Sequence, residues 1–355
     1  MHNIIVHHPK DLTIDWAQRV VNQHNTDIVV SGVDITSVDI ATTTRIRIKV
    51  EHNEPSLLPE QWFVKLPSMA WQARLITALP RLLHTEVRFY NEVAHSVSVT
   101  VPHFLAAQSK LGRGATLVLT DVTEFGAIPG SPGDALTLTQ ATRVVEQLAK
   151  FHACFWNKGC INHSYPWLAG PVRSLEDFLG TAMAVPLMKR GLQQAGELVP
   201  FKLYAQAIHY ARNRRQAMRF LTQAQQTLVH HDCHPGNIFW NQSQPGLLDW
   251  QLIRFSEGIS DIAYFLSVSL NTETRRLHEA SLIAIYAQCL QDNGIAGIDV
   301  NILQQRYRAH LIYPFEAMII TLAIGGMMNL QSNHELIRRT AAAIEDLDAF
   351  SAIPL

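Results

Sequence analysis

Apolar and polar residues alternate in the early part of the chain, a pattern that predicts β-strands. Three β-rich runs lie at residues 28–35, 43–50 and 61–66, and the third carries Lys65 near its end. A short segment of helical periodicity, which ends near Asn25, precedes them. The sequence therefore predicts a small, β-rich unit at the start of the chain.

Helical spacing dominates the second part of the chain. Thr137 and Gln140 have the spacing of a capping box. An apolar stripe of helical period follows them at Val144, Leu148, Phe151 and Phe155. Residues 124–134, just before this helix, are rich in glycine and proline and predict a loop. From Arg275 onward the pattern is helical only.

The most apolar late segment, residues 312–330, has the length of a membrane span. A spanning helix needs about 20 predominantly apolar residues. This segment is interrupted by Pro314, Glu316, Gly325, Gly326 and Asn329. We therefore expect a buried helix of the second unit here, and no insertion into a membrane.

The composition is that of a soluble globular protein large enough for two lobes. The chain has 355 residues, of which 47% are hydrophobic and 17% charged, and a net charge of −1. Such a balance gives no sign of a nucleic-acid partner. The four cysteines show no paired spacing and predict reduced thiols: Cys154, Cys160, Cys233 and Cys289. With no signal-peptide pattern at the N-terminus, a cytoplasmic location is expected.

A later pair of apolar runs, at residues 238–240 and 246–248, flanks turn-forming residues and predicts a hairpin. The hairpin would bring Asp232, Asn237 and Asp249 to one place. Asn237 and Asp249 offer the oxygen ligands that Mg²⁺ prefers, with room left for phosphate oxygens. Asp232 could then accept the proton of a hydroxyl that attacks a phosphoryl group.

These residues carry a specific resemblance. The spacing His230-x-Asp232-x-x-x-x-Asn237, followed by Asp249-Trp250, resembles the catalytic loop and metal-binding aspartate of the aminoglycoside phosphotransferase and choline kinase group. Members of that group have the protein-kinase fold but phosphorylate small molecules. Residues 148–156 resemble the ecdysteroid-kinase-like subgroup in particular.

The resemblance implies an α+β, protein-kinase-like fold of two lobes. A small, β-rich lobe at residues 1–120 would bind the nucleotide, and a hinge and linker would follow at residues 121–135. A larger, mainly helical lobe at residues 136–355 would carry catalysis and the substrate site.

The resemblance also implies the part that each residue plays. The protein would transfer the γ-phosphoryl group of ATP to a hydroxyl of a small organic molecule, with Asp232 as the base and Asn237 and Asp249 as Mg²⁺ ligands. Lys65 would contact the nucleotide phosphates. Glu86, on the next predicted helix, would hold that lysine in place.

Other positions would complete the nucleotide site. Backbone groups near Thr120 and Val122 would bind the adenine edge. Thr43 lies in the expected phosphate-binding loop, which contains no glycine between Ser37 and Thr44. Glycine normally lets backbone amides approach phosphate closely, but small threonine side chains could still form an amide cradle with help from their hydroxyls.

Structural support is expected from residues around the catalytic loop. His230 would hydrogen-bond the loop backbone, and Asp261 would brace the loop from the following helix. His152 is interpreted as a hydrogen-bonded core residue rather than a catalyst. Glu92 is the alternative to Glu86 as partner of the lysine.

Three other functions stay open at this point. A degenerate, kinase-like binding protein would keep the fold without catalysis, and the loop without glycine favours it. A protein kinase is disfavoured because Asp261 lies only twelve positions after Asp249, which leaves little room for an activation segment. A transition-metal hydrolase could use His230, His231 and His234, but would leave Asn237 and Asp249 without a role.

The acceptor is not specified by any motif. A polycationic aminoglycoside would need a pocket lined by carboxylates, whereas the late helices carry only scattered acids, Glu273, Glu279 and Glu316. The surrounding residues are apolar: Tyr313, Phe315, Met318, Ile319, Ile320, Met327 and Met328. If they line the acceptor site, an apolar alcohol is the better candidate and an aminoglycoside the alternative.

Overall fold

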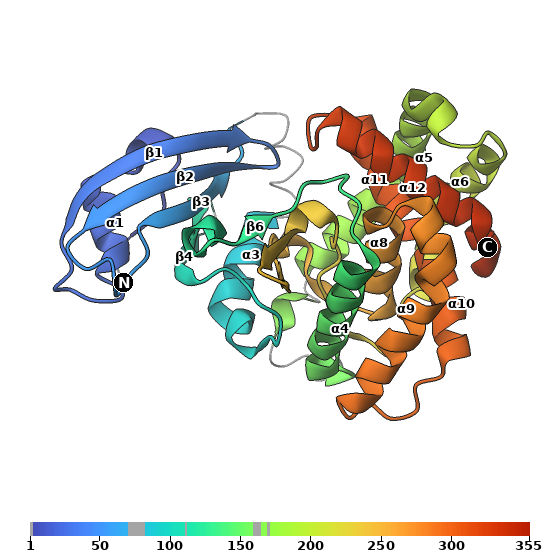
Figure 1. The fold of residues 1–355 in the computed structure, drawn as a ribbon. Coiled ribbons are helices and arrows are strands. Elements are labelled where there is room, and N and C mark those ends of the chain that lie inside the picture. Colours follow the sequence, from blue (N-terminus) through green and yellow to red (C-terminus); the bar gives the residue numbers. More distant parts are fainter. Residues whose placement is uncertain (1–2, 70–81, 111, 159–164, 169–170) are drawn as a thin grey trace.

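A computed structural model describes residues 3–69, 82–110, 112–158, 165–168 and 171–355. The chain forms a small lobe dominated by one β-sheet and a larger, mostly helical lobe (Figure 1). Cys154, Cys233 and Cys289 are free thiols, and Cys160 lies outside the described residues.

The small lobe is built on an antiparallel sheet with the strand order β1-β2-β3-β5-β4. Its strands are β1 (Val30–Ile40), β2 (Thr43–His52), β3 (Gln61–Pro67), β4 (Phe104–Lys110) and β5 (Gly114–Thr120). Helix α1 (Ile14–Val21) covers one face of the sheet, where Trp16 and Val20 pack in one core with Ile46 and Ile48. Since side chains alternate along a strand, the other face of β2 carries Arg45, Arg47 and Lys49.

Helix α3 (Leu82–Arg88) connects the two lobes. It continues into a π-helical turn, Phe89–Val93, and its buried apolar side chains belong to the large hydrophobic core that includes the large lobe and part of β5. Phe89 stacks on Trp250 with 4.1 Å between the ring centroids and 8° between the planes. The helix is therefore fixed to the large lobe while it lies against the small-lobe sheet.

The large lobe surrounds α8 (Ile259–Ser269), whose eleven residues are all buried. The helices around it include α4 (Leu138–Phe155), α5 (Pro171–Ala195), α6 (Lys202–Arg212), α7 (Arg214–Phe220), α9 (Thr272–Asp292), α10 (Val300–His310), α11 (Ile312–Ile324) and α12 (Leu330–Asp346). The capping box of α4 is confirmed, because the Thr137 hydroxyl accepts from the Gln140 N–H and the Gln140 side chain accepts from the Thr137 N–H.

Short strands of the large lobe lie at its boundary with the small one. Strand β7 (Thr227–Val229) pairs with β10 (Arg254–Ser256), and β8 (Ile238–Asn241) lies between β6 (Ile128–Pro129) and β9 (Gln244–Leu247). Strands β8 and β9 form the predicted hairpin, which turns at Gln242 and Ser243. The hairpin delivers Asp249 two residues after β9 ends.

The expectation of one buried helix over residues 312–330 is wrong in its extent. Helix α11 ends at Ile324, because Gly325 and Gly326 adopt left-handed backbone angles with φ of 77° and 71°. A new helix, α12, then begins after Asn329, whose side chain caps it. No helix within the described ranges is long and apolar enough to cross a membrane.

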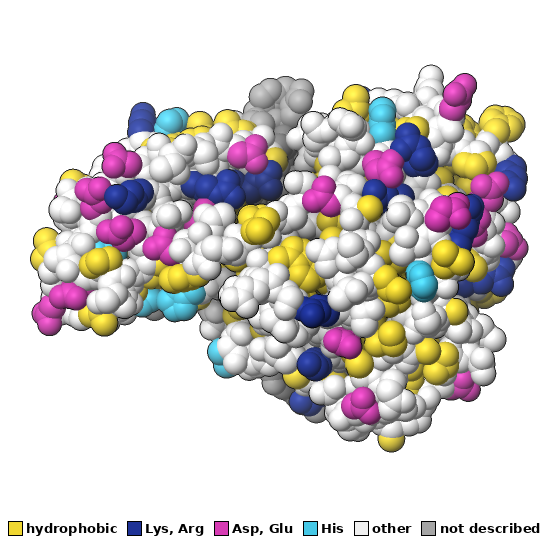
Figure 2. Space-filling view, in the orientation of Figure 1, with side chains coloured by type: hydrophobic (Ala, Val, Ile, Leu, Met, Phe, Trp, Pro, Cys, Tyr) yellow, Lys and Arg dark blue, Asp and Glu magenta, His cyan; other side chains and the backbone are white. Residues whose placement is uncertain are grey.

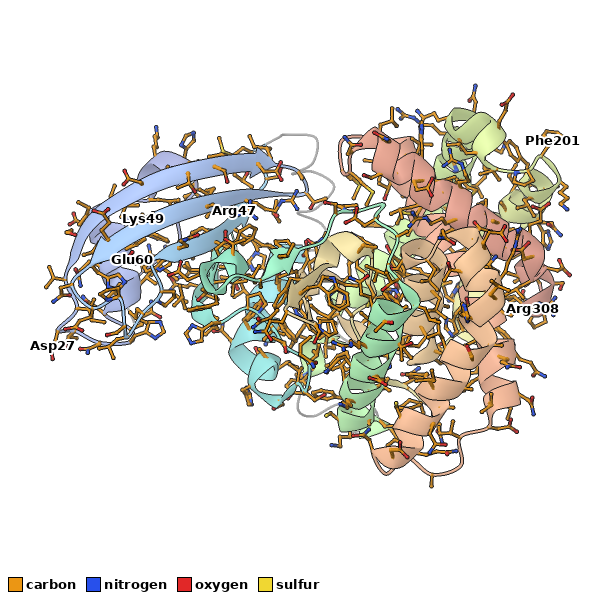
Figure 3. All side chains as sticks on the ribbon, viewed as in Figure 1. Asp27, Arg47, Lys49, Glu60, Phe201 and Arg308 are labelled. Atoms are coloured by element: carbon orange, nitrogen blue, oxygen red, sulfur yellow. The ribbon has the colours of Figure 1, made fainter. Side chains whose placement is uncertain are left out.

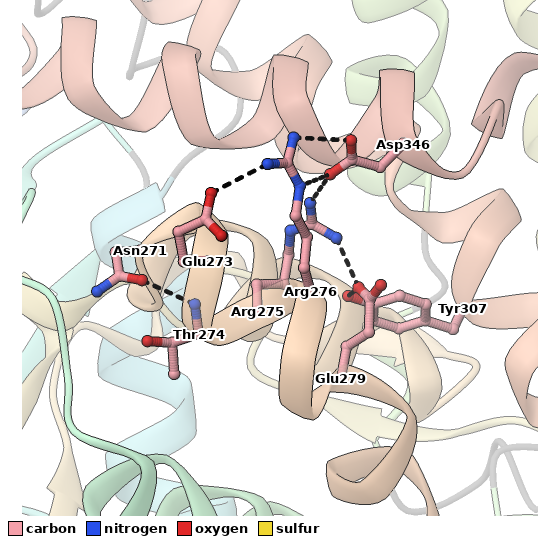
Figure 4. Close-up of polar contacts among 8 residues, drawn as sticks. All are labelled: Asn271, Glu273, Thr274, Arg275, Arg276, Glu279, Tyr307 and Asp346. Carbon is pink, nitrogen blue, oxygen red and sulfur yellow. Dashed lines mark hydrogen bonds and ion pairs between the residues drawn. The ribbon is translucent and has the colours of Figure 1, made fainter.

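Buried charge also joins the late helices. Arg275 of α9 is almost completely buried and is paired with Glu279 and with Asp346 of α12 (Figure 4). Arg276 reaches the same Asp346 and also Glu273. Two of the acids considered for an acceptor site, Glu273 and Glu279, are thus engaged by arginines of their own helix.

Candidate active site

The loop after β7 is fixed from below by the first turn of α8. Asp261 is fully buried, and its carboxylate accepts hydrogen bonds from the backbone N–H groups of His230 at 2.7 Å and His231 at 2.8 Å. The Nε2 of His152 lies 3.2 Å from Oδ2 of the same carboxylate, and His152 is a buried core residue, as expected. A charged acceptor that receives two backbone donors holds the loop in one conformation.

His230 ties this loop to the end of the β8–β9 hairpin. Its Nε2 lies 2.8 Å from the Leu248 carbonyl oxygen, and its Nδ1 accepts from the Asp232 N–H at 3.3 Å. This assigns the ring proton to Nε2. Burial lowers the pKa of His230, although nearby Asp261 and Asp232 oppose that shift, so the ring is a neutral hydrogen-bonding group that links Asp232 to Asp249.

Asp232 is held by two donors. The Tyr264 hydroxyl donates to its Oδ1 at 2.7 Å, and the Asn237 amide donates to its Oδ2 at 3.0 Å. The same amide nitrogen also donates to the Asp232 carbonyl oxygen at 2.9 Å. Because both contacts use the nitrogen of Asn237, its amide oxygen remains available for a cation.

Lys65 of β3 lies between two carboxylates on the opposite side of the site. Its Nζ lies 2.8 Å from both carboxylate oxygens of Glu86 and 3.1 Å from Oδ1 of Asp249. Burial alone would lower the pKa of Lys65, but Asp249 and Glu86 outweigh it and raise that pKa. Burial raises the pKa of Glu86 to about 7, against the attraction of Lys65. Glu92 instead pairs with Arg88 at the surface.

The backbone at Asp249 is unusual. Asp249 adopts a left-handed conformation, with φ of 61° and ψ of 69°, which only a few per cent of residues other than glycine adopt. The next residue, Trp250, donates its backbone N–H to Glu86 and stacks on Phe89. Helix α3 and the π-helical turn after it therefore hold Asp249 in place through a polar and an aromatic contact of Trp250.

The charged and amide side chains of the site border one cavity of about 490 Å³ between the lobes. Its walls carry Lys65, Glu86, Asp232, Asn237 and Asp249. On the small-lobe side the cavity extends to Thr120 and Val122, where the strand β5 passes into the large lobe. A cation and oxygen ligands at one end of a cleft are suited to a phosphate-bearing ligand and a hard metal ion.

Comparisons with known proteins identify the family of the chain. The family model described as "Ecdysteroid kinase-like family" matches residues 40–295. The chain belongs to the ecdysteroid kinase-like family. No curated protein matches the chain.

Solved structures support the fold of this ecdysteroid kinase-like protein. The choline kinase of Cryptosporidium parvum Iowa II aligns with a TM-score of 0.56 at 11% identity, over 96% of this chain and 97% of that one. A putative aminoglycoside phosphotransferase of Ralstonia eutropha JMP134 aligns with a TM-score of 0.50 at 13% identity, over 96% and 98% of the two chains. The protein-kinase-like fold is confirmed, and family and fold together support a kinase-like phosphotransferase of small molecules.

The expected phosphate-binding loop of this family member differs from the prediction. Residues 37–40 and 43–44 are strand, and only Ala41 and Thr42 form the turn between β1 and β2. Thr43 is buried in β2 and is not among the residues that line the cavity, whereas Ala41 and Thr42 are. The predicted threonine cradle is therefore a tight hairpin, because the β1–β2 ladder continues to the pair Ile40 and Thr44.

The histidines of the catalytic loop do not converge on a metal site. His230 bonds Leu248, and His231 stacks on Tyr313 with ring centroids 3.9 Å apart. His234 lies 3.9 Å from Asp232. Within the described ranges, no three His, Cys, Asp or Glu side chains are grouped so as to hold a metal ion. The arrangement gives no support to the transition-metal hydrolase.

Tyr264 and Arg45 were missed by the sequence analysis. Tyr264 follows Asp261 by three residues, so both side chains lie on one face of α8, but in so apolar a helix this spacing does not set it apart from a core residue. Arg45 lines the cavity from β2, next to Lys65. Its signal is the alternation of β2, which places it on the face away from α1.

Proposed function

We propose that this ecdysteroid kinase-like protein is a cytoplasmic enzyme that transfers the γ-phosphoryl group of ATP to a hydroxyl of a small organic molecule, with Mg²⁺. The observation that carries the proposal is the meeting of Lys65, Glu86 and Asp249 with Asp232 and Asn237 at one cavity. This arrangement argues against a degenerate binding protein, because a site used only for binding has no need of a second, separately oriented carboxylate at Asp232.

The residues fit a magnesium ion. Asp249 provides a carboxylate, and Asn237 provides an amide oxygen that is left available by the two bonds of its nitrogen. Carboxylate and amide oxygens are suitable ligands for Mg²⁺, which when bound would neutralise charge on the phosphate oxygens. The lysine ammonium, held by Glu86, would contact the same phosphates.

Asp232 is placed to orient the acceptor and to take its proton. Tyr264 and Asn237 each hold one oxygen of its carboxylate, so its lone pairs have a fixed direction toward the cavity. In phosphoryl transfer the protein contributes mainly positioning and charge stabilisation. Backbone groups at Thr120 and Val122 would hold the base of the nucleotide at the far end of the cavity.

The acceptor end of the cavity favours an apolar alcohol. Its large-lobe wall carries Tyr313, Ala317, Met318, Met327 and Met328. Phe315 and Ile319, which were considered for the same wall, are fully buried core residues. Glu316 is buried and paired with Arg214 at 2.7 Å, so it does not serve this wall. Flexible methionines adapt to apolar ligands of irregular shape, whereas an aminoglycoside would need free carboxylates.

The first test uses Asp249→Asn. We expect Mg²⁺ with ATP or GTP to raise the melting temperature of the wild type, because a ligand of the folded state stabilises it by RT ln(1 + [L]/Kd). Loss of one charged metal ligand should weaken Mg²⁺-nucleotide binding roughly tenfold to a hundredfold. Glu273→Gln, on the exposed start of α9, is the matched control and should behave like the wild type. If nucleotide raised the melting temperature equally with and without Mg²⁺, in both the wild type and Asp249→Asn, the metal assignment would be contradicted.

A further inference from the structure

Arg45 and Lys65 lie opposite each other on neighbouring strands at the wall of the cavity. The two residues are direct partners in the antiparallel pairing of β2 with β3, and both line the cavity. Directly opposed residues in an antiparallel pair have Cβ atoms about 4.5–5.5 Å apart and point to the same face. Two cationic side chains therefore reach the same part of the cavity, an arrangement that favours an anion between them.

The guanidinium of Arg45 has unused hydrogen-bonding capacity. Its Nη2 lies 2.6 Å from Asp39, a carboxylate whose side chain is 64% exposed. Its Nε is buried and has no hydrogen-bond partner within the described part of the chain.

The other cations on this face of β2 are less suited to such a role. Lysine and arginine side chains form a row on the small lobe that ends at the cleft (Figure 2). Arg47 and Lys49 project from the same strand (Figure 3). Arg47 is paired with the buried Asp121 at 2.6 Å, and Lys49 is paired with Glu51 at 3.0 Å and does not line the cavity.

The turn between β1 and β2 offers few backbone donors to phosphate. The Ala41 N–H donates to the Thr43 carbonyl oxygen at 3.0 Å, and the Ala41 carbonyl accepts from the Ser68 hydroxyl at 2.7 Å. A glycine-rich loop, by contrast, binds phosphate with free backbone N–H groups. A side-chain cation at Arg45 can supply what this hairpin lacks, since the planar guanidinium binds phosphate oxygens with two parallel hydrogen bonds.

We infer that Arg45 binds the polyphosphate of the donor nucleotide and takes the place of the backbone amides of a glycine-rich loop. The inference rests on the proposed function, because it adds a residue to the same nucleotide site. When nucleotide binds, the Arg45 guanidinium would leave its ion pair with the exposed Asp39 and would pair with phosphate oxygens beside Lys65.

The test compares Arg45→Met with Lys49→Met. Both changes remove one cation from the same face of β2, but only the first removes it from the cavity. We expect Arg45→Met to weaken binding of Mg²⁺-ATP and of inorganic tripolyphosphate roughly 10- to 100-fold, as for a lost hydrogen bond to a charged group. AMP, with a single phosphate, should bind both variants like the wild type, and Lys49→Met should retain its affinity for all three ligands.

A second variant is expected to gain affinity, a result that a folding defect could not produce. Asp39→Asn removes the exposed competitor of the phosphates and leaves Arg45 in place, so it should tighten ATP binding a few-fold. Wild-type ATP affinity in Arg45→Met, or unchanged or weaker ATP binding in Asp39→Asn, would overturn the inference and leave the proposed function standing. Absence of Mg²⁺-ATP binding by the wild type itself would overturn both.

Discussion

Asp232→Asn is expected to remove most phosphoryl transfer while nucleotide binding stays nearly intact. Both oxygens of the native carboxylate are hydrogen-bond acceptors, one for Tyr264 and the other for Asn237. An asparagine of the same shape cannot take the proton of the attacking hydroxyl, and its NH₂ group would meet one of these two donors. Loss of a general base costs roughly 10²- to 10⁴-fold in turnover.

The measurement is kcat for one acceptor, together with the Kd of Mg²⁺-ATP, for the variant and the wild type. Asp292→Asn, at the exposed end of α9, is the control for loss of one negative charge. Tyr264→Phe removes only one of the two groups that orient the carboxylate and should lower kcat by less than Asp232→Asn does. Wild-type turnover in Asp232→Asn would show that another group receives the proton.

Asp261→Ala is expected to destabilise the fold by about 3–5 kcal/mol, because it leaves buried donors without an acceptor. The carboxylate is fully buried and accepts the backbone N–H groups of His230 and His231, while His152 contacts it as well. For a chain of this size we expect the melting temperature to fall by roughly 4–8 °C. The catalytic loop should lose its fixed conformation at the same time.

Asp261→Asn refines this test, since an amide keeps one acceptor oxygen and should cost less than alanine. Urea denaturation, followed at constant pH, gives the free energy of unfolding for each variant. Asp292→Ala, at the same exposed position as the control above, serves as the control for alanine. A destabilisation of Asp261→Ala no larger than that of the control would mean that the loop is not held through this carboxylate.

The parts of the site that could be predicted from sequence are those that the chain brings together locally. Asp232 and Asn237 lie in one short loop, and a single hairpin separates them from Asp249. A chain segment this short has few ways to fold, so the order of residues already implies their proximity. Lys65 and Glu86 could be predicted for another reason, because a strand that ends in a lysine and a following helix with a glutamate together resemble a known arrangement.

Other features depend on contacts that the sequence does not display. A tyrosine in a helix as apolar as α8 has the pattern of a core residue, and only the fold shows that Tyr264 reaches Asp232. Alternation in β2 placed Arg45 on one face without showing that this face borders a cavity. Gly325 and Gly326 could equally have stayed inside a helix, and their positive φ angles are seen only in the structure.

The most direct test of the central claim is transfer of labelled phosphate from [γ-³²P]ATP. The wild type is incubated with Mg²⁺ and a panel of apolar alcohols, with water as the only acceptor in a parallel sample. We predict labelled product from at least one alcohol, or slow release of phosphate to water, and loss of both in Asp232→Asn. Tight binding of Mg²⁺-ATP with no transfer to water or to any alcohol would contradict the account and identify the protein as a nucleotide-binding member that does not catalyse.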